Sequence, residues 1–204
     1  MKRNWLQILV YVFICILFVW NTSCNSKQGS TTQNESKATV KLEDAEMKAL
    51  TEMFNYFVKT DLQPITKDGE NDDQLFTFGV HYFYVFEKGK FEKANMEEGL
   101  NMKIKISLVN ELIAKYFGKE IKEPLNMDGH ITYKDGYFYT RESDSPEASA
   151  KIEELSDNGD GLYTAIVGIY SPVTGEIDKT SNFMKATIKK VDGRFILIDW
   201  QKKQ

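Results

Sequence analysis

The chain has few of the residues from which redox and metal sites are built. Its 204 residues include two cysteines and two histidines. Cys15 lies in an N-terminal apolar segment of the kind that is removed on export. Cys24 is then the thiol that remains, which excludes an intramolecular disulfide. A zinc site using His81 and His130 would need carboxylates to complete its ligands. We therefore expect no metal and no cofactor.

Motifs and charge exclude further classes of protein. The sequence contains no G-x-S-x-G nucleophile turn, phosphate loop or dinucleotide-binding fingerprint. In the acidic turn that begins at Asp157, Gly159 and Gly161 occupy positions where a calcium loop needs oxygen ligands. The net charge is −4, and loss of Lys2 and Arg3 with the leader would make the remainder more acidic. We expect no nucleic-acid partner, since nucleic-acid binding depends on basic surfaces.

The clearest motif is the N-terminal segment. The basic pair Lys2-Arg3 precedes an apolar run, Trp5–Trp20, which one glutamine interrupts, and Asn21-Thr22-Ser23-Cys24 follows. A basic start, an apolar run and small residues before a cut site define an export signal. The segment resembles the signals of bacterial lipoproteins, although Asn21 stands where these usually have Leu. The resemblance implies that residues 1–23 are a signal peptide and that Cys24 carries the lipid.

Two other fates of this segment remain open. It could stay as an uncleaved anchor helix, or be cleaved to leave Cys24 unmodified. The apolar run falls just short of the roughly 17 to 25 residues needed to cross a bilayer. Residues 24–41, rich in Ser, Thr, Asn, Gln and Lys, predict a lipidated cysteine followed by a flexible tether. We expect an exported protein anchored to membrane lipid of a bacterial cell envelope, facing the periplasm or at the cell surface.

The length of residues 42–204 suits a single domain. Apolar residues at i, i+3 and i+4 predict helices at about 43–60, 72–87 and 107–119. Pro64 and Gly89 stand beyond the first two helices, and Gly118 stands at the end of the third, where stop signals are expected. Ser107 is the expected N-cap of the third helix. The second helix is aromatic almost all round, so we expect it to be deeply buried.

The period of the apolar residues changes to two after residue 127. It predicts strands at 131–134, 137–141, 151–155, 162–170, 186–191 and 195–200. Asp135-Gly136 and Asp192-Gly193 suit type I′ hairpin turns, in which both central residues need a positive φ. Helices first and strands afterwards predict an α+β fold, with three N-terminal helices on one face of an antiparallel sheet of about six strands in a hairpin meander.

This order of elements resembles the cone-shaped α+β fold of the nuclear transport factor 2 type. Short phrases at 116–119, 133–139 and 157–163, built of aromatic and turn residues, also resemble an uncharacterised group of bacterial lipoproteins. The resemblance, over about residues 45–200, implies a strongly curved sheet closed over by the helices. It offers no catalytic residue to transfer to this chain.

Two side chains are candidates for a pocket. His81, in the second helix, could act as a general acid or base; the alternative is a partly buried, hydrogen-bonded histidine. Asp199 shares one face of its predicted strand with Phe195 and Leu197, which predicts that it turns toward the apolar interior, where burial would raise its pKa. The alternative is an exposed aspartate at a fraying strand end. We expect the two side chains not to meet in one pocket.

The chain is rich in aromatic residues, with 13 Phe and 10 Tyr. Most must form the core, while a minority at its edge could line a pocket for a small apolar ligand or a peptide. We expect a non-catalytic binding or accessory module whose partner is an unknown protein or small apolar ligand. The alternatives are a carrier or sensor of a small apolar ligand and, third, a proton-transfer enzyme that uses Asp199 and His81.

Overall fold

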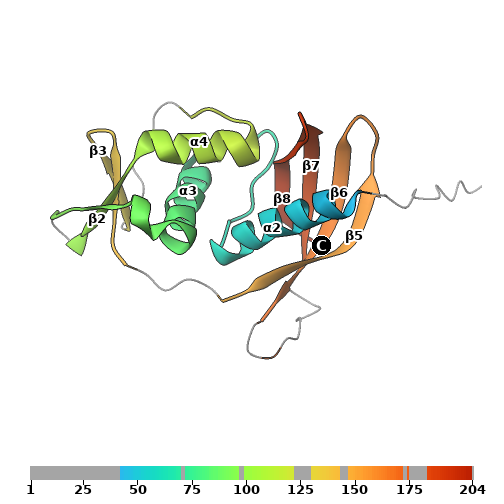
Figure 1. The fold of residues 1–204 in the computed structure, drawn as a ribbon, viewed down its shortest axis with the longest axis horizontal. Helices are drawn as coiled ribbons and strands as arrows, with labels where there is room; N and C mark the ends of the chain where they lie inside the picture. Colours follow the sequence, from blue (N-terminus) through green and yellow to red (C-terminus); the bar gives the residue numbers. More distant parts are fainter. Residues whose placement is uncertain are drawn as a thin grey trace, which may run out of the picture. The chain divides into compact units, whose positions relative to one another are not determined.

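A computed structural model describes residues 42–69, 72–96, 99–121, 130–142, 147–171, 174 and 183–203. Within these ranges the chain forms three α-helices and two four-stranded antiparallel sheets, so the fold is of the α+β class (Figure 1). The predicted signal peptide, Cys24 and the tether lie outside the described residues.

The predicted helices are present as α2 (Asp44–Lys59), α3 (Asp72–Phe86) and α4 (Ile106–Phe117). One face of α2 is buried, and α3 is buried on most of its surface, as its aromatic composition predicts. Gly118 ends α4 with a φ of 62°, a left-handed conformation that favours glycine. The Ser107 cap is wrong, since α4 begins one residue earlier and Lys105 holds the N-cap position. Gly89 lies inside a short 3-10 helix, η1 (Lys88–Lys90), that follows α3.

The first sheet has the strand order β1-β2-β4-β3. Its strands are β1 (Glu92–Lys93), β2 (Met102–Lys105), β3 (Ile131–Lys134) and β4 (Tyr137–Thr140). The second sheet is a meander of β5 (Ser149–Asp157), β6 (Leu162–Tyr170), β7 (Phe183–Val191) and β8 (Arg194–Lys202). At both Asp-Gly turns the two residues have φ values between 50° and 81°, which confirms the predicted hairpin turns.

The prediction of one six-stranded meander is wrong, because β4 and β5 do not pair. One edge of β4 is taken by β3, and the other by β2, a strand that the sequence analysis missed. With both edges of β4 occupied, β5 begins a second sheet in which it pairs with β6 alone. The six predicted strands are therefore divided two and four between separate sheets.

One apolar core joins both sheets and all three helices. Phe54 of α2 is fully buried and stacks on Trp200 of β8, with ring centroids 5.8 Å apart. α4 packs against α3, β2 and β8. The helices α3 and α4 approach so closely at Gly79 that a Cβ there would lie 2.5 Å from Val109 Cγ1.

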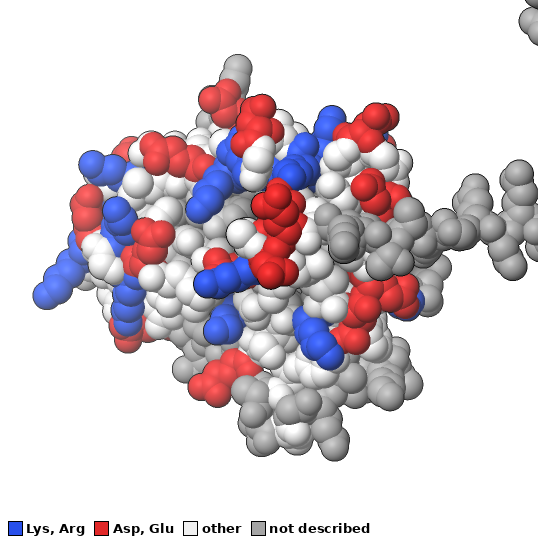
Figure 2. Space-filling view, turned by 45° about the vertical axis from the view of Figure 1, so that its right-hand side comes forward, with Lys and Arg blue, Asp and Glu red and all other residues white. Residues whose placement is uncertain are grey.

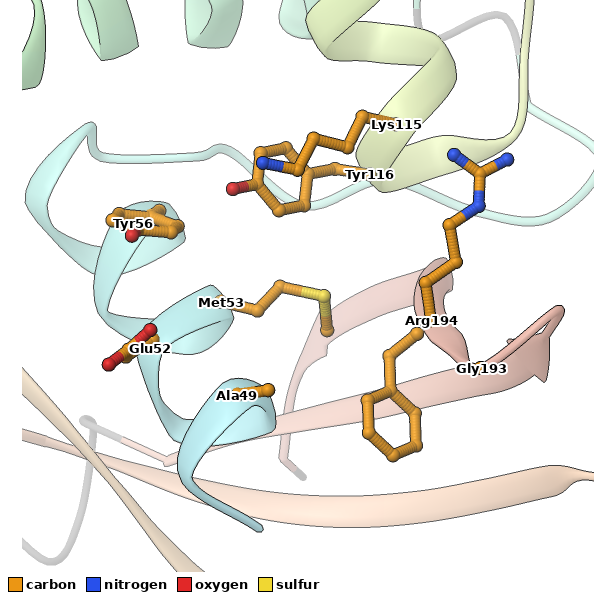
Figure 3. A pocket seen from close by; sticks show the side chains of 9 residues that line it. Ala49, Glu52, Met53, Tyr56, Lys115, Tyr116, Gly193 and Arg194 are labelled. Carbon is orange, nitrogen blue, oxygen red and sulfur yellow. The ribbon is translucent and has the colours of Figure 1, made fainter. Parts of the chain in front are cut away.

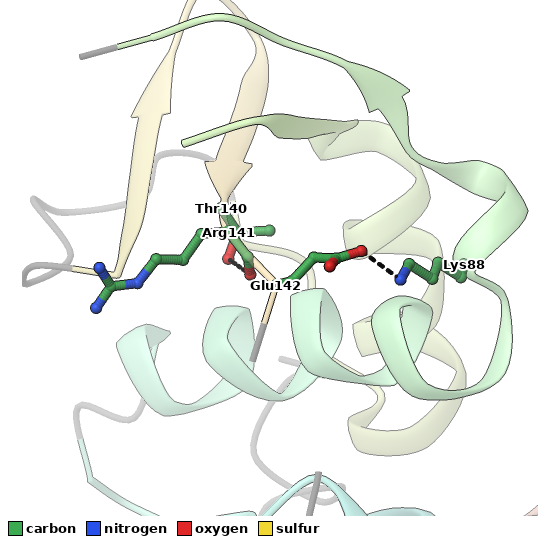
Figure 4. A network of polar contacts seen from close by, with 4 residues as sticks. All are labelled: Lys88, Thr140, Arg141 and Glu142. Carbon is green, nitrogen blue, oxygen red and sulfur yellow. Dashed lines mark hydrogen bonds and ion pairs between the residues drawn. The ribbon is translucent and has the colours of Figure 1, made fainter. Parts of the chain in front are cut away.

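Both edges of the second sheet are bonded to other parts of the chain. The Asn55 side chain of α2 accepts a hydrogen bond of 2.8 Å from the backbone N–H of Ala150 in β5. At the other edge, Ile65 and Trp200 exchange two backbone hydrogen bonds of 2.9 Å. An exposed ion pair of 2.6 Å between Lys88 and Glu142 joins η1 to the residues after β4 (Figure 4).

Candidate functional site

A pocket of about 270 Å³ lies between α2, α4 and the turn from β7 to β8 (Figure 3). Helix α2 contributes Ala49, Glu52, Met53 and Tyr56, which share one side of the helix because their spacing follows its period of 3.6 residues. Ala49 and Glu52 are exposed, whereas Met53 is 3% exposed and extends from the core into the pocket. Along α2 the pocket thus spans the boundary between core and solvent.

The facing wall comes from α4 and the β7–β8 hairpin. Lys115 and Tyr116 occupy the last turn of α4, just before the helix ends at Gly118. In the hairpin, the tight Asp192-Gly193 turn places Arg194 at the start of β8 with its side chain exposed. Phe195 follows on the opposite face of the strand and is 7% exposed. Three elements far apart in the sequence therefore meet at this pocket.

The lining separates into an apolar floor and a charged rim. Ala49, Met53 and Phe195 supply apolar surface, while Lys115 and Arg194 supply two cations. Neither cation forms an ion pair with any residue in the part of the chain that the structure describes. Lys115 Nζ instead lies 4.8 Å from the ring centroid of Tyr116, a weak cation–π contact. Two positive groups are thus available at the rim.

The tyrosines beside the pocket are neutral hydrogen-bonding groups. Burial raises the pKa of Tyr116 to about 12, and burial likewise raises the pKa of Tyr82, whose hydroxyl is hydrogen-bonded to that of Tyr116. Edge-to-face contact with Phe57 and tilted contact with Tyr56 hold the Tyr116 ring in place. At neutral pH these phenols remain protonated, which suits them to orient a ligand and not to act as bases.

His81 lies in α3 and is not among the residues that line this pocket. It is half-buried, and its Nδ1 lies 3.4 Å from the backbone oxygen of Thr60. Burial lowers the pKa of the imidazole, and the bond to Thr60 opposes this effect in part. Burial therefore favours the neutral form of the ring. This arrangement matches the alternative that the sequence left open, a hydrogen-bonded histidine at the edge of the core.

Asp199 does not lie on the buried face of β8 that Phe195 and Leu197 share. The prediction that its side chain turns toward the interior is therefore wrong. A β-bulge shifts the register between β7 and β8: Ile188 pairs with Leu197, but Thr187 pairs with Asp199. The extra residue reverses the alternation, so that Trp200 is buried and Asp199 is half-buried, with its Oδ1 accepting a hydrogen bond of 2.9 Å from Gln201. Asp199, like His81, is absent from the pocket lining.

The described ranges contain neither a metal-ligand cluster nor a membrane-spanning helix. No cluster of three or more His, Cys, Asp or Glu side chains there could hold a metal ion. None of the helices described has the length and apolar character needed to cross a membrane. On the face shown in Figure 2, acidic and basic side chains are interspersed and form no continuous basic patch.

The sequence analysis missed the charged residues of this pocket. Lys115 and Arg194 are isolated charges in their own segments, and no local motif distinguishes them from other surface cations. One indirect signal was present for Arg194, since the tight turn at Asp192-Gly193 places this residue at the start of the following strand. Comparison of the chain with protein-family models, curated proteins and solved structures finds no match, so the pocket is the feature from which function must be argued.

Proposed function

We propose that this chain is a non-catalytic ligand-binding module, exported and held at a bacterial cell envelope through a lipid on Cys24. The observation that carries the binding role is the pocket of about 270 Å³ between α2, α4 and the β7–β8 turn. An apolar floor with a few polar groups around it is the usual composition of a small-molecule site. The volume is at the small end of such sites, which favours a small ligand over a long lipid chain.

The absence of a catalytic role is part of the proposal. A general base must come within hydrogen-bond reach of the proton that it removes. The two candidate groups, His81 and Asp199, do not line the pocket, and Tyr116, which does, remains protonated well above neutral pH. The groups that do face the pocket are suited to contact and orient a ligand.

The envelope location is supported by the sequence. The basic, apolar and small-residue regions before Cys24 fit a lipoprotein signal, and the polar residues 24–41 suit a tether. A tether of that length has an end-to-end distance of roughly 20 to 25 Å if it behaves as a flexible coil. That distance would hold the domain clear of the lipid headgroups.

The pocket proposal is tested by filling the pocket without disturbing the core. Ala49 is exposed, so Ala49→Trp should occupy the pocket while the fold is retained. Lys48→Trp adds the same bulk at the neighbouring exposed position outside the lining. We expect phenylpropanol, an uncharged aromatic probe, to bind the parent and the Lys48→Trp variant in calorimetric titrations, and not the Ala49→Trp variant. Equal heats for all three proteins would refute binding in this pocket.

A further inference from the structure

We infer that the ligand of this pocket is a small amphipathic carboxylate: one apolar ring or short chain that carries a single negative charge. The inference rests on the proposed binding function and adds the charge and size of the ligand. It is carried by two observations. The apolar part of the lining adjoins Arg194, with the acidic residue Glu52 on the opposite side of the pocket. Among the described residues, Arg194 has no anionic partner.

Arg194 is placed to receive an anion that sits on the apolar floor. Its side chain rises from the hairpin toward α4, and Met53 projects from α2 toward the same part of the pocket (Figure 3). The Lys115 side chain runs from the last turn of α4 in the other direction, toward Tyr56 of α2 (Figure 3). A guanidinium presents two parallel N–H donors that match the two oxygens of a carboxylate.

The acidic residue of the lining does not occupy this position. Glu52 belongs to α2, and its carboxylate lies on the opposite side of the pocket from Arg194 (Figure 3). No ion pair joins Glu52 to a described residue. An anion bound at Arg194 therefore lies across the pocket from the Glu52 carboxylate.

The size of the pocket limits the apolar part of the ligand. A closed cavity of roughly 150 Å³ holds benzene, so about 270 Å³ accommodates one aromatic ring with a short acidic chain, or a short fatty acid. A long-chain fatty acid such as palmitate would leave most of its chain outside this space. Met53 and Phe195 offer an adaptable thioether and an aromatic ring, both of which pack well against an aromatic ligand.

The test compares three probes of the same shape and different charge. Hydrocinnamate, phenylpropanol and phenylpropylamine are titrated into the purified protein in lipid nanodiscs, with empty nanodiscs as the blank. We expect hydrocinnamate to bind about tenfold more tightly than phenylpropanol, which is the effect of one charge-assisted contact of about 1.4 kcal/mol. The amine should bind most weakly, and palmitate should not compete with hydrocinnamate.

Variants assign the effect to Arg194. Arg194→Gln should weaken hydrocinnamate about tenfold and leave phenylpropanol unchanged, because it removes the one charge-assisted contact. Lys115→Gln should weaken hydrocinnamate less, since its ammonium group is directed toward Tyr56. Lys189→Gln, on the same hairpin, and Lys48→Gln, on α2, remove exposed cations outside the lining and should change neither affinity. Glu52→Gln should strengthen hydrocinnamate binding, because it removes the repulsion.

The outcomes separate this inference from the proposed function. Equal affinity for hydrocinnamate and phenylpropanol, both abolished by Ala49→Trp, would refute the carboxylate and leave the binding module standing. Tightest binding of the amine, or competition by palmitate, would refute the charge or the size of the ligand. If none of the probes binds, the proposed function itself fails.

Discussion

Phe54 is the side chain whose removal should destabilise the fold most clearly. Its ring is fully buried, stacks on Trp200 at 5.8 Å with an interplanar angle of 21°, and meets Phe57 edge to face at 6.3 Å. Truncation of a buried Phe to Ala costs about 3–5 kcal/mol. This range already includes lost ring contacts, and two such contacts, worth about 0.5–1.5 kcal/mol each, place Phe54 in its upper part. We therefore expect Phe54→Ala to lower the free energy of unfolding by about 4–5 kcal/mol, in the upper part of the range.

Urea unfolding followed by far-ultraviolet circular dichroism measures this loss. With a slope of about 2 kcal/mol per molar urea, the midpoint should fall by about 2 M. Tyr133→Ala is the matched control, because this aromatic side chain is 36% exposed and should cost about 1 kcal/mol or less. If Phe54→Ala and Tyr133→Ala shift the midpoint equally, α2 does not pack on β8 as described.

Three further changes test other parts of the molecule. Cys24→Ser should move the protein from the membrane fraction to the soluble fraction or leave it unprocessed, since two or more acyl chains are needed for stable anchoring; a mature variant that still sediments with membranes would contradict lipidation. Gly79→Ala should destabilise by about 1–3 kcal/mol through the clash with Val109, whereas Gly89→Ala, where a Cβ meets nothing within 4 Å, should not; equal melting temperatures would disprove the close helix contact. Burial raises the pKa of Tyr116 from 10.0 to about 12, so the folded state favours the protonated phenol. The contribution of Tyr116 to the free energy of unfolding is therefore complete below pH 10 and is lost as the pH rises toward 12. Over this pH range the free energy of unfolding should fall less steeply in Tyr116→Phe than in the parent, and an unchanged slope would assign the loss to other groups.

The sequence predicted those helices and turns that are specified by residues close together in the chain. The 3.6-residue spacing around Phe54 located α2, and Asp135-Gly136 and Asp192-Gly193 located two hairpins because their backbone conformation is set by the residues themselves. The strand β2 was missed. Apolar and polar residues alternate in Met102–Lys105, but the segment has only four residues before α4 begins, which is too few to distinguish the alternation from chance. That one strand decides that the fold has two sheets, since it occupies the edge of β4 that β5 would otherwise have used.

The candidate site was predictable only in its composition. An aromatic excess indicated that some rings would face a pocket, and Tyr116 does. The positions of Lys115 and Arg194 depend on how α4 and the hairpin pack, which no short segment encodes. Asp199 was placed on the wrong face because strict alternation cannot anticipate a bulge: one extra residue, Ile198, changes the face of the residues that follow it.

The bonds at the two edges of the second sheet bear on association between copies of the chain. A long unpaired strand edge is a template for aggregation, and the proposed membrane anchor would bring copies together at high two-dimensional concentration. Here the Asn55 side chain occupies an N–H of β5, and Ile65 pairs with the backbone of Trp200 on β8. A neighbouring copy would have to displace these bonds to add a strand at Ala150 or Trp200, so contacts within the chain compete with strand addition at both edges.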